Sequence, residues 1–550
     1  MIRTLIRPPQ RPVPTPTRAL SSVEQLRRRL LGRPRTAREK LWGWLGPAIL
    51  TIIGGILRFW NVGRPHQLIF DETYYVKEGW SLVLYGFERK QDKSTGISNF
   101  PDNLFTMGNP KVFGSHADFV VHPPMGKWLI GLGESIFGIN SSFGWRIATA
   151  ATGTIAIYLV GRAAWHLFRS PLLASIASLL LCFEGAEFVM SRTGILDIMV
   201  MFWALAGFVA LLADRSRTRG ILARKAAQMQ DTGTWATRRS IGPWLGWRPW
   251  RWVAAVCLGL DVGTKWSGGW FLAVFCLMSV WWDLGARRSV GVRHWISATF
   301  IKDALPAAVY MVGAALATYL ATWVGWLHST DAYDRQWAAD NPAVKGGISP
   351  DSHLVSWMPD ALRSMWQYNI EMYNSAVSIT APHPYQSNPW SWMLQTRPTS
   401  FFYESPHNCA GGYCSKAITS LGNVGIWWFG TIALVMVLFY WLFGRDWRAG
   451  AIWAGVAAGW FPWFMYQERT IFTFYSVAFV PYVVLACVFV LGLMLGPATA
   501  GARRIVVGKI AVGGYVVLVV ALFVFFWPIW TGQVIPQPHW QWRMWLASWV

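Results

Sequence analysis

Long apolar runs recur along most of this 550-residue chain, and they constrain its fold more than any other feature. A helix needs about 20 apolar residues to cross the hydrocarbon core of a bilayer. Inside that core every backbone polar group must find a partner within the protein, which favours helices for runs of this length. The sequence therefore predicts an all-α polytopic membrane protein with about 11 transmembrane helices. The spans are expected near residues 44–60, 143–166, 171–189, 195–213, 251–264, 267–284, 304–326, 423–443, 449–466, 470–495 and 506–530.

The composition agrees with this fold class. Hydrophobic residues make up 53% of the chain and charged residues only 14%, whereas a soluble protein carries about 25% charged residues. Many of the 38 tryptophans stand near the ends of apolar runs, where an indole ring meets the lipid headgroups. One run, 251–284, allows two interpretations: two short spans that meet at the Gly-rich turn 263–269, or one long broken segment.

The formal net charge of +22 is distributed in short basic blocks between the apolar runs. Cytoplasmic loops of membrane proteins carry this bias, whereas a nucleic-acid-binding protein would need a soluble basic domain, and none is visible. With about 11 spans and a cytoplasmic N-terminus, all these loops fall on the inner side and the C-terminus lies outside. We therefore expect a multi-pass protein of the cell (plasma) membrane. The basic blocks lie at 214–250, 285–303, 445–448 and 503–509.

The same topology divides the chain into three parts. Residues 1–43 are Pro-rich and basic and contain no apolar run followed by a cleavage site, so they are not a cleavable signal peptide. They are expected to form a disordered cytoplasmic tail with a short surface helix near 23–31. Residues 44–530 then form the transmembrane domain, and 531–550 form an extracytoplasmic C-terminal segment.

Two long polar segments, 61–142 and 327–422, fall on the outer side, and long connections of this kind are usually functional. Neither contains a nucleotide-binding motif, and the histidines of the second lack the spacing of metal ligands. The second segment is rich in aromatic residues, which either stack on a sugar or peptide or anchor the segment at the membrane surface. These residues are Trp357, Trp366, Tyr368, Tyr373, Trp390, Trp392 and Tyr403.

The six cysteines fall into two groups. Cys409 and Cys414 bracket a Gly-rich turn in a polar segment, where a local disulfide would form if that segment lies outside the cytoplasm. The others lie inside apolar runs and are expected to be small hydrophobic residues of the core. They are Cys182, Cys257, Cys276 and Cys487.

Two adjacent carboxylates, Asp71 and Glu72, follow the first span by about ten residues. One interpretation is a helix start, with Asp71 as the N-cap and Glu72 in the first turn. The other is a general base held at the membrane boundary. A carboxylate this close to the bilayer is expensive to desolvate, which favours a functional role.

A second motif, His122-Pro123-Pro124-Met125-Gly126-Lys127, precedes the second expected span. Two prolines fix the backbone and start a helix. The motif is either a rigid turn with a solvated lysine, or it brings His122 and Lys127 near an anionic group, and neither interpretation is favoured by the residues alone.

Several cations on the predicted outer side run against the charge bias of the loops. Such a charge is usually paired internally or bound to a ligand. The internal pairs would be, for example, Arg192 with Asp197 or Arg469 with Glu468. The ligand would be the phosphate of an anionic lipid that arrives from the bilayer. The cations are Arg146, Arg192, Lys265 and Arg469.

Together these motifs resemble the protein O-mannosyltransferases (family 39 glycosyltransferase-like), and most closely their bacterial branch. The likeness runs from about residue 44 to the end of the chain. The segment 327–422 is too short to hold the β-trefoil domain of the eukaryotic enzymes, so their acceptor-binding behaviour is not carried over. The matching stretches are FDETYYVKEGW (70–80), HPPMGKW (122–128), SRTGILDIMVMF (191–202), GTKWSGGWF (263–271) and HPYQSNPWSW (383–392).

The resemblance implies a GT-C glycosyltransferase fold and the transfer of mannose from polyprenyl-phosphate-mannose to Ser or Thr hydroxyls of exported proteins, with inversion at the anomeric carbon. It implies no metal or other cofactor. Asp71 matches the general base, and Glu72 would orient it or the acceptor and pair with Arg146. Lys265 and Arg469, with Arg192, would bind the donor phosphate. Supporting or acceptor-binding roles would fall to His122, Pro123, Lys127, His383, Tyr385 and Trp390.

Two other functions remain open. A related GT-C enzyme could glycosylate a lipid instead of a protein. A lipid or sugar transporter would show paired repeats with broken helices at similar positions in both halves, and only the turn 263–269 is of that kind. The expected partners are the lipid-linked donor, exported Ser/Thr-containing polypeptides, membrane lipids and the secretion translocon, with no nucleic acid.

Overall fold

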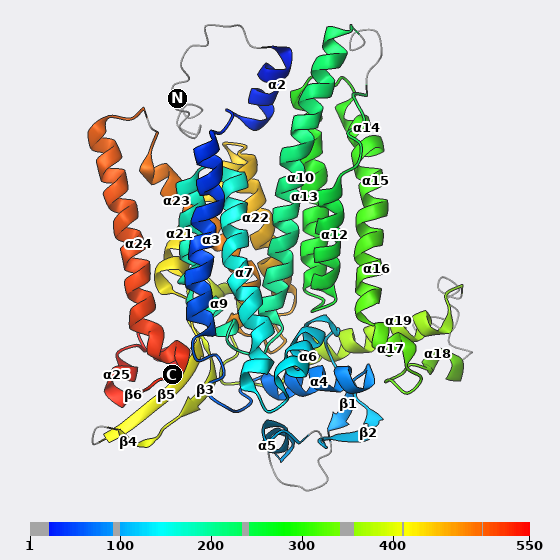
Figure 1. The fold of residues 1–550 in the computed structure, drawn as a ribbon, viewed down its shortest axis with the longest axis vertical. Coiled ribbons are helices and arrows are strands. Elements are labelled where there is room, and N and C mark those ends of the chain that lie inside the picture. Colours follow the sequence, from blue (N-terminus) through cyan, green and yellow to red (C-terminus); the bar gives the residue numbers. More distant parts are fainter. Residues whose placement is uncertain are drawn as a thin grey trace.

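The protein is a bundle of long helices that carries small helices and strands at one end, as the computed structural model shows (Figure 1). Polar segments gather at that end together with the C-terminus, whereas the N-terminal helix lies at the other. The structure describes residues 21–91, 100–109, 111–233, 241–341, 357–409, 412–497 and 499–550.

Among the described residues, eight helices are long and apolar enough to cross a membrane. Each corresponds to one of the expected spans, and α10 continues well beyond the span predicted for it. They are α3 (Ala37–Phe59), α7 (Ser142–Phe168), α10 (Asp197–Asp231), α13 (Gly268–Ser289), the run through α14 and α16 (Trp295–Thr322), α21 (Val424–Leu442), the run through η5 and α23 (Thr473–Leu495) and α24 (Ala502–Thr531).

The other three expected spans are helical but short. A helix of 14 residues reaches only about 21 Å, less than the roughly 30 Å of the hydrocarbon core. The expected number of about 11 crossings therefore stays a prediction. The short segments are α8 (Pro171–Cys182) with α9 (Gly185–Met190), α12 (Pro249–Val262), and α22 (Trp447–Trp460) with η4 (Phe461–Met465).

The run 251–284 consists of two helices, α12 and α13, that meet at the Gly-rich turn. Gly268 allows this close meeting, because a Cβ there would lie 2.6 Å from the backbone carbon of Asp261. The turn lies at the end of the bundle that carries the polar segments (Figure 1).

The N-terminal region differs from the expected disordered tail of residues 1–43. The surface helix expected near 23–31 is present as α2 (Ser22–Leu31), and α3 already begins at Ala37. Both helices start with a capping box, formed by Ser21 with Glu24 and by Thr36 with Glu39, which satisfies two otherwise free backbone N–H groups at each start. Residues 1–20 lie outside the described part of the chain.

In its described residues, 61–91, 100–109 and 111–142, the first long segment folds into three short helices and a two-stranded antiparallel sheet. The HPP motif does not lead directly into the second span; it starts a separate helix, α6, that packs against α4 before α7 begins. The elements are α4 (Glu72–Tyr85), β1 (Arg89–Gln91), α5 (Phe100–Thr106), β2 (Phe113–Ala117) and α6 (Met125–Phe137).

The second long segment contains a sheet that the expected all-α fold did not include. Strand β5 pairs antiparallel with β3, β4 and β6, so the C-terminal segment is hydrogen-bonded to the loop through Ser415 and Ile535. The elements of this segment are α17 (Val324–His328), α18 (Trp337–Asp340), α19 (Asp360–Val377), α20 (Pro389–Trp392), β3 (Thr399–Glu404), β4 (His407–Cys409) and β5 (Gly412–Ser420). Those of the C-terminal segment are β6 (Val534–Pro536), α25 (Gln537–Gln541) and η6 (Ala547–Trp549).

Candidate functional site

Glu72 forms a fully buried ion pair with Arg146, as the family resemblance implied. The guanidinium Nε and one terminal nitrogen each lie 2.7 Å from a carboxylate oxygen of Glu72. Arg146 also donates to the backbone carbonyls of Val62, Pro65 and Gln67. A buried pair is stable only when its remaining donors and acceptors are satisfied in this way, so Glu72 and Arg146 hold the loop after α3 in one conformation.

Asp71 stands next to this pair, at the N-cap of α4, but its side chain forms no capping hydrogen bond. The preceding residue, Phe70, has a φ of 50°, which is unfavourable for a bulky side chain. Its ring is held by stacking on Phe401 at 4.5 Å and by an edge contact with Phe474 at 5.4 Å. Aromatic packing from a distant loop therefore stabilises the strained turn that presents Asp71.

Burial raises the pKa of the Asp71 carboxyl to about 6. The neighbouring ammonium of Lys265 opposes this rise, while the carboxylates of Asp197 and Glu78 add to it. A general base works best when its pKa is close to the operating pH. The environment of Asp71 therefore makes it a stronger base than an ordinary aspartate.

Lys265 lies in the turn between α12 and α13, and its ammonium is 2.6 Å from a carboxylate oxygen of Asp197 at the start of α10. It also lies 5.4 Å from the ring centre of Tyr475. The HPP helix is fastened to the same turn, because the N–H of Met125 donates to the carbonyl of Gly263 at 2.9 Å. Residues of three expected motifs thus meet at one place.

Arg469 has no carboxylate partner among the described residues, and its buried Nε has no hydrogen-bond partner there. Its guanidinium lies 5.9 Å from the ring centre of Trp463 and is close enough to His122 and Tyr475 to affect both electrostatically. The expected pairing with Glu468 is absent. A partly buried cation without a counter-ion is able to bind an anion.

His122 lies close enough to Lys265 and Arg469 for both charges to act on it. Burial lowers the pKa of its imidazole well below the ordinary value, and the charges of Lys265, Lys127 and Arg469 lower it further. The ring is therefore neutral at physiological pH and can donate or accept a hydrogen bond without adding charge. Its ring centre is 6.0 Å from that of Tyr75 on α4.

Lys127, from the same motif, does not reach this cluster. It is fully buried and bonds to Glu78 at 3.0 Å and Glu88 at 2.8 Å. The alternative of a solvated lysine is therefore wrong: the anionic groups beside Lys127 belong to the protein itself, and the pair fixes α6 to α4. Pro123 is buried next to the helix start.

Arg192 also lies outside the cluster and binds the end of α3. Its guanidinium donates to the carbonyls of Arg58 at 2.8 Å and Trp60 at 2.6 Å, with weaker bonds to Leu57 and Asn61. These are the free carbonyls at the C-terminal end of α3, where a cation is favoured. The structure does not bring Arg192 to the donor-phosphate position expected for it.

The motif that begins at His383 packs beside the turn that carries Arg469. Ser387 donates its N–H to the carbonyl of Ile471 at 2.8 Å, and the ring of His383 makes an edge contact with Phe472 at 5.0 Å. Trp390 is exposed and touches Phe464, and Tyr385 lies over Arg397. Among the described residues, none of these ring contacts is with Asp71, Lys265 or Arg469.

Cys414 is disulfide-bonded, and the four cysteines of the apolar helices are free, as expected. The side chain of Cys409 lies outside the described part of the chain, so its pairing with Cys414 stays a prediction. Within the residues that the structure describes, no three His, Cys, Asp or Glu side chains form a group that could hold a metal ion.

Four residues near the site were not expected there from the sequence: Asp197, Tyr475, Glu78 and Glu88. Asp197 could have been predicted to belong to the site, since a carboxylate at the start of an apolar run needs a partner. The other three are ordinary in sequence and become part of the site only through the packing of distant elements.

Comparison with known proteins identifies relatives along most of the chain. The profile of the family described as "Dolichyl-phosphate-mannose-protein mannosyltransferase" matches residues 97–321, and that of the "C-terminal four TMM region of protein-O-mannosyltransferase" matches residues 361–549. A polyprenol-phosphate-mannose–protein mannosyltransferase of Mycolicibacterium smegmatis (strain MKD8) is 35% identical and covers 93% of this chain and 94% of its own. The corresponding protein of Mycobacterium tuberculosis is 33% identical and covers 93% and 92%.

The fold is similar to that of a solved complex, the Saccharomyces cerevisiae protein O-mannosyltransferase Pmt1–Pmt2 bound to its sugar donor. The TM-score is 0.67 at 14% sequence identity, over 98% of this chain and 97% of that chain. This likeness confirms the expected GT-C type fold. The long matches to bacterial proteins agree with the bacterial branch that the motifs indicated.

Proposed function

This chain belongs to the protein O-mannosyltransferase family, and we propose that it transfers mannose from polyprenyl-phosphate-mannose to Ser or Thr hydroxyls of exported polypeptides. The observation that carries the proposal is the grouping of Asp71, whose pKa is about 6, with Lys265 and Arg469. Lys265 acts on Asp71 directly, and Arg469 and Asp71 both act on Tyr475. A partly buried base with cations close by is the arrangement that glycosyl transfer from a lipid phosphate requires.

In the proposed reaction, the acceptor hydroxyl attacks the anomeric carbon of mannose while the carboxylate of Asp71 takes its proton. The bond between that carbon and the phosphate oxygen breaks, and polyprenyl phosphate leaves with the bonding electrons. Attack from the face opposite the leaving group inverts the configuration at the carbon. Glu72 does not touch the substrate in this proposal; it holds Asp71 in place through Arg146.

The leaving phosphate gains negative charge as the bond breaks, and Lys265 and Arg469 stabilise that charge. Arg469 is available for this role because no described carboxylate pairs with it. Lys265 is held by Asp197, so we propose that this carboxylate positions the ammonium before the donor arrives. Arg192, which caps α3, is left out of the donor site.

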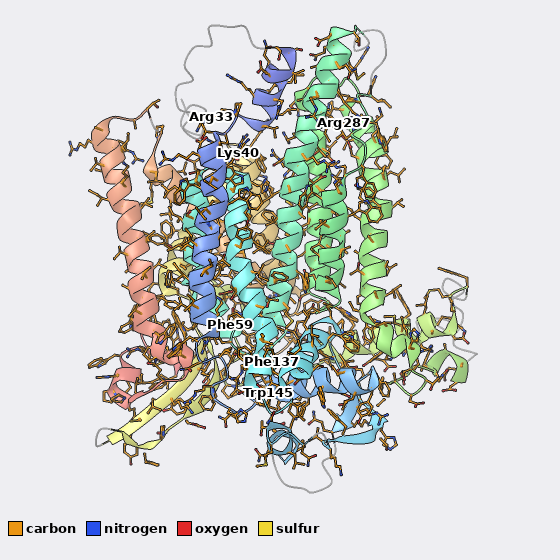
Figure 2. The ribbon with its side chains drawn as sticks, in the orientation of Figure 1. Arg33, Lys40, Phe59, Phe137, Trp145 and Arg287 are labelled. Atoms are coloured by element: carbon orange, nitrogen blue, oxygen red, sulfur yellow. The ribbon has the colours of Figure 1, made fainter. Side chains whose placement is uncertain are left out.

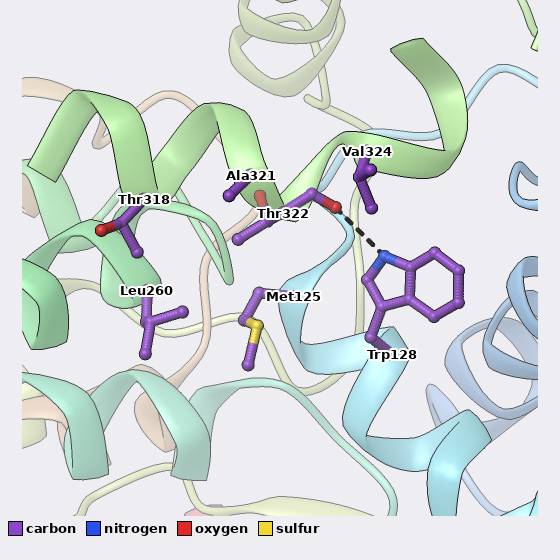
Figure 3. A pocket seen from close by; sticks show the side chains of 7 residues that line it. All are labelled: Met125, Trp128, Leu260, Thr318, Ala321, Thr322 and Val324. Atoms are coloured by element: carbon purple, nitrogen blue, oxygen red, sulfur yellow. Dashed lines mark hydrogen bonds between the residues drawn. The ribbon is translucent and has the colours of Figure 1, made fainter. Parts of the chain in front are cut away.

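The lipid part of the donor has a suitable place near the turn that carries Lys265, since the lining residue Met125 is hydrogen-bonded to Gly263 of that turn. An open apolar groove of 330 Å³ runs between α6, α12 and the end of the helix through α16 (Figure 3). The indole N–H of Trp128 donates to the carbonyl of Thr322, another lining residue, at 3.1 Å. We propose that the first isoprene units lie here. The lining residues are Met125, Trp128, Leu260, Thr318, Ala321, Thr322 and Val324.

We also propose that the end of the bundle that carries Asp71 faces the outside of the cell membrane. Figure 2 shows Arg33, Lys40 and Arg287 at the opposite end from Phe59, Phe137 and Trp145. Basic residues accumulate on the cytoplasmic side of membrane proteins. An exported polypeptide, delivered by the translocon, would then meet the flipped lipid-linked sugar at the site.

The test is a transfer assay with the purified full chain in membranes, labelled polyprenyl-phosphate-mannose and a Ser/Thr-rich peptide. We expect label in the peptide and release of unlabelled lipid phosphate. Label that enters only lipid would instead identify a lipid-glycosylating enzyme. Movement of intact donor across the membrane with no transfer to the peptide would identify a transporter.

A further inference from the structure

Two arginines of α10, Arg215 and Arg219, lie far from the candidate site. Arg215 follows Asp197 by 18 residues on one continuous helix, a rise of about 27 Å. This is close to the thickness of the hydrocarbon core. Since Asp197 belongs to the site at one membrane boundary, Arg215 stands at the headgroup depth of the other boundary.

Aromatic residues surround Arg215 at this depth. Its guanidinium carbon lies 3.2 Å from the ring centre of Trp447, the first residue of α22, and 5.6 Å from that of Trp282 on α13. Arg219, one turn further along, donates to the carbonyl of Trp282 at 3.3 Å. Tryptophan is the residue that marks the headgroup layer, so three helices form a wall around the two cations there.

Among the described residues, the carboxylates whose charge reaches the two arginines, Asp283 and Asp446, are already paired with other guanidiniums. Three buried carboxylates are matched by three guanidiniums, and the carboxylate of Asp446 is matched by Arg448. Neither Arg215 nor Arg219 forms an ion pair with a described residue, although both are largely buried and the Nε atom of each lacks a hydrogen-bond partner. The balanced group consists of Asp214, Asp283 and Asp303 with Arg248, Arg251 and Arg287.

Two like charges one helical turn apart repel each other, and burial strengthens the repulsion. A buried arginine normally has a carboxylate or phosphate partner that satisfies its donors. The protein supplies no such partner among its described residues. We propose that Arg215 and Arg219 bind a phosphate group, either the headgroup of an anionic phospholipid or free phosphate, on the membrane face opposite the candidate active site.

The proposal can be tested by thermal unfolding of the purified full chain in a neutral detergent. Phosphatidylglycerol, phosphatidylcholine or inorganic phosphate is added at constant ionic strength. We expect phosphatidylglycerol to raise the unfolding midpoint by about 2 °C or more and phosphatidylcholine to leave it unchanged. An equal rise with inorganic phosphate would assign the site to the free anion, and a rise with phosphatidylglycerol alone would assign it to the lipid headgroup.

Arg217 provides the matched control, because it lies on the same helix between the two arginines and is exposed. The shift should disappear in Arg215→Gln/Arg219→Gln, fall by at least half in Arg219→Gln, and persist in Arg217→Gln. Each variant is compared with itself in the absence of added phosphate, so a change in its basal stability does not affect the result. Absence of a shift in the unmodified protein, or an undiminished shift in both Gln variants of the buried positions, would overturn the proposal.

Discussion

At the scale of single residues, two adjacent carboxylates have opposite environments. Glu72 is fully buried and bonded to Arg146 and to the backbone N–H of Gly194 at 2.7 Å. Asp71 is partly exposed, and no described residue donates a hydrogen bond to its carboxylate. A carboxylate whose lone pairs are all engaged cannot accept a substrate proton. Glu72 is therefore suited to a positioning role and Asp71 to proton transfer.

Asp71→Asn should abolish measurable transfer, with a fall in kcat of about 100-fold or more, because the amide cannot take the hydroxyl proton. In the unmodified protein, kcat/KM should fall about tenfold per pH unit below pH 6, as the carboxyl with a pKa of about 6 becomes protonated. Initial rates with labelled donor at several pH values check both expectations. Near-normal turnover by the variant would remove Asp71 from the base role.

The thermal stability of Asp71→Asn should also depend on pH differently from that of the unmodified protein. The pKa of Asp71 is raised from 3.8 to about 6 on folding, so the folded state loses stability relative to the unfolded state as pH rises through that window. Asn lacks this titration. The thermal midpoint of Asp71→Asn relative to the unmodified protein should therefore increase between pH 4 and pH 6, which also shows that the inactive variant is folded.

Removal of one partner of the buried Glu72–Arg146 pair should destabilise the protein. Arg146→Met leaves the Glu72 carboxylate buried without a counter-ion, at a cost of about 3–5 kcal/mol in the free energy of unfolding. Glu72→Gln/Arg146→Met should recover part of that loss, since no charge remains buried. Denaturant unfolding of the two variants measures the difference; equal losses would contradict the buried pairing.

At the scale of elements, the position of Asp71 depends on how closely α4 and α6 approach. A Cβ on Gly79 would lie 2.8 Å from the carbonyl oxygen of Lys127 and 3.0 Å from the backbone nitrogen of Gly131. The ion pairs of Lys127 with Glu78 and Glu88 hold the same two helices together. The helix that carries Asp71, α4, is therefore fixed to α6, which begins at the HPP motif. The start of α6 is in turn hydrogen-bonded to the turn that carries Lys265.

Gly79→Ala should separate α4 from α6, because backbone atoms cannot move aside as a flexible side chain can. We expect a destabilisation of about 1–3 kcal/mol and a loss of transfer activity. Gly313→Ala is the control: it lies in a helix where a Cβ meets open space, so alanine should be neutral or stabilising. Equal effects of both variants on unfolding would argue against the close packing.

The apolar groove belongs to the element scale as well. Ala321→Trp should fill it and raise the KM for the lipid-linked donor about tenfold, with little change in kcat, since Ala321 is remote from the reacting atoms in the proposed mode of binding. Leu316→Trp, at an exposed position of the same helix, is the matched control and should leave the KM unchanged. A KM that is insensitive to Ala321→Trp would place the polyprenyl chain elsewhere.

At the scale of the whole molecule, charge and polar structure are separated to opposite ends. The exposed Met107 lies in the first polar segment, and the exposed Arg217 lies at the far end of α10. In intact cells, a membrane-impermeant maleimide should label Met107→Cys at once and Arg217→Cys only after permeabilisation. The reverse pattern would invert the proposed orientation.

Residue chemistry and the lengths of the apolar runs were enough to predict the membrane class, the helical bundle and the motifs from which the site is built. The surface helix near 23–31 was expected and is present as α2. The earlier start of α3 follows from the capping box Thr36–Glu39, which was present in the sequence but outweighed by its Pro-rich, basic composition. The strands that pair with β5 were not predicted, because they are short and β6 is far from β5 in the sequence.

What the sequence by itself determined is that acids and cations of the right kind lie in segments that can share one face of a membrane, because hydropathy and loop charge are read along the chain. Only the tertiary structure decided which of them meet. Arg192 and Lys265 are both cations in expected motifs, yet one caps α3 and the other faces Asp197 and Asp71. A charge is assigned to its partner by distance in space, and that distance depends on how helices far apart in the sequence pack.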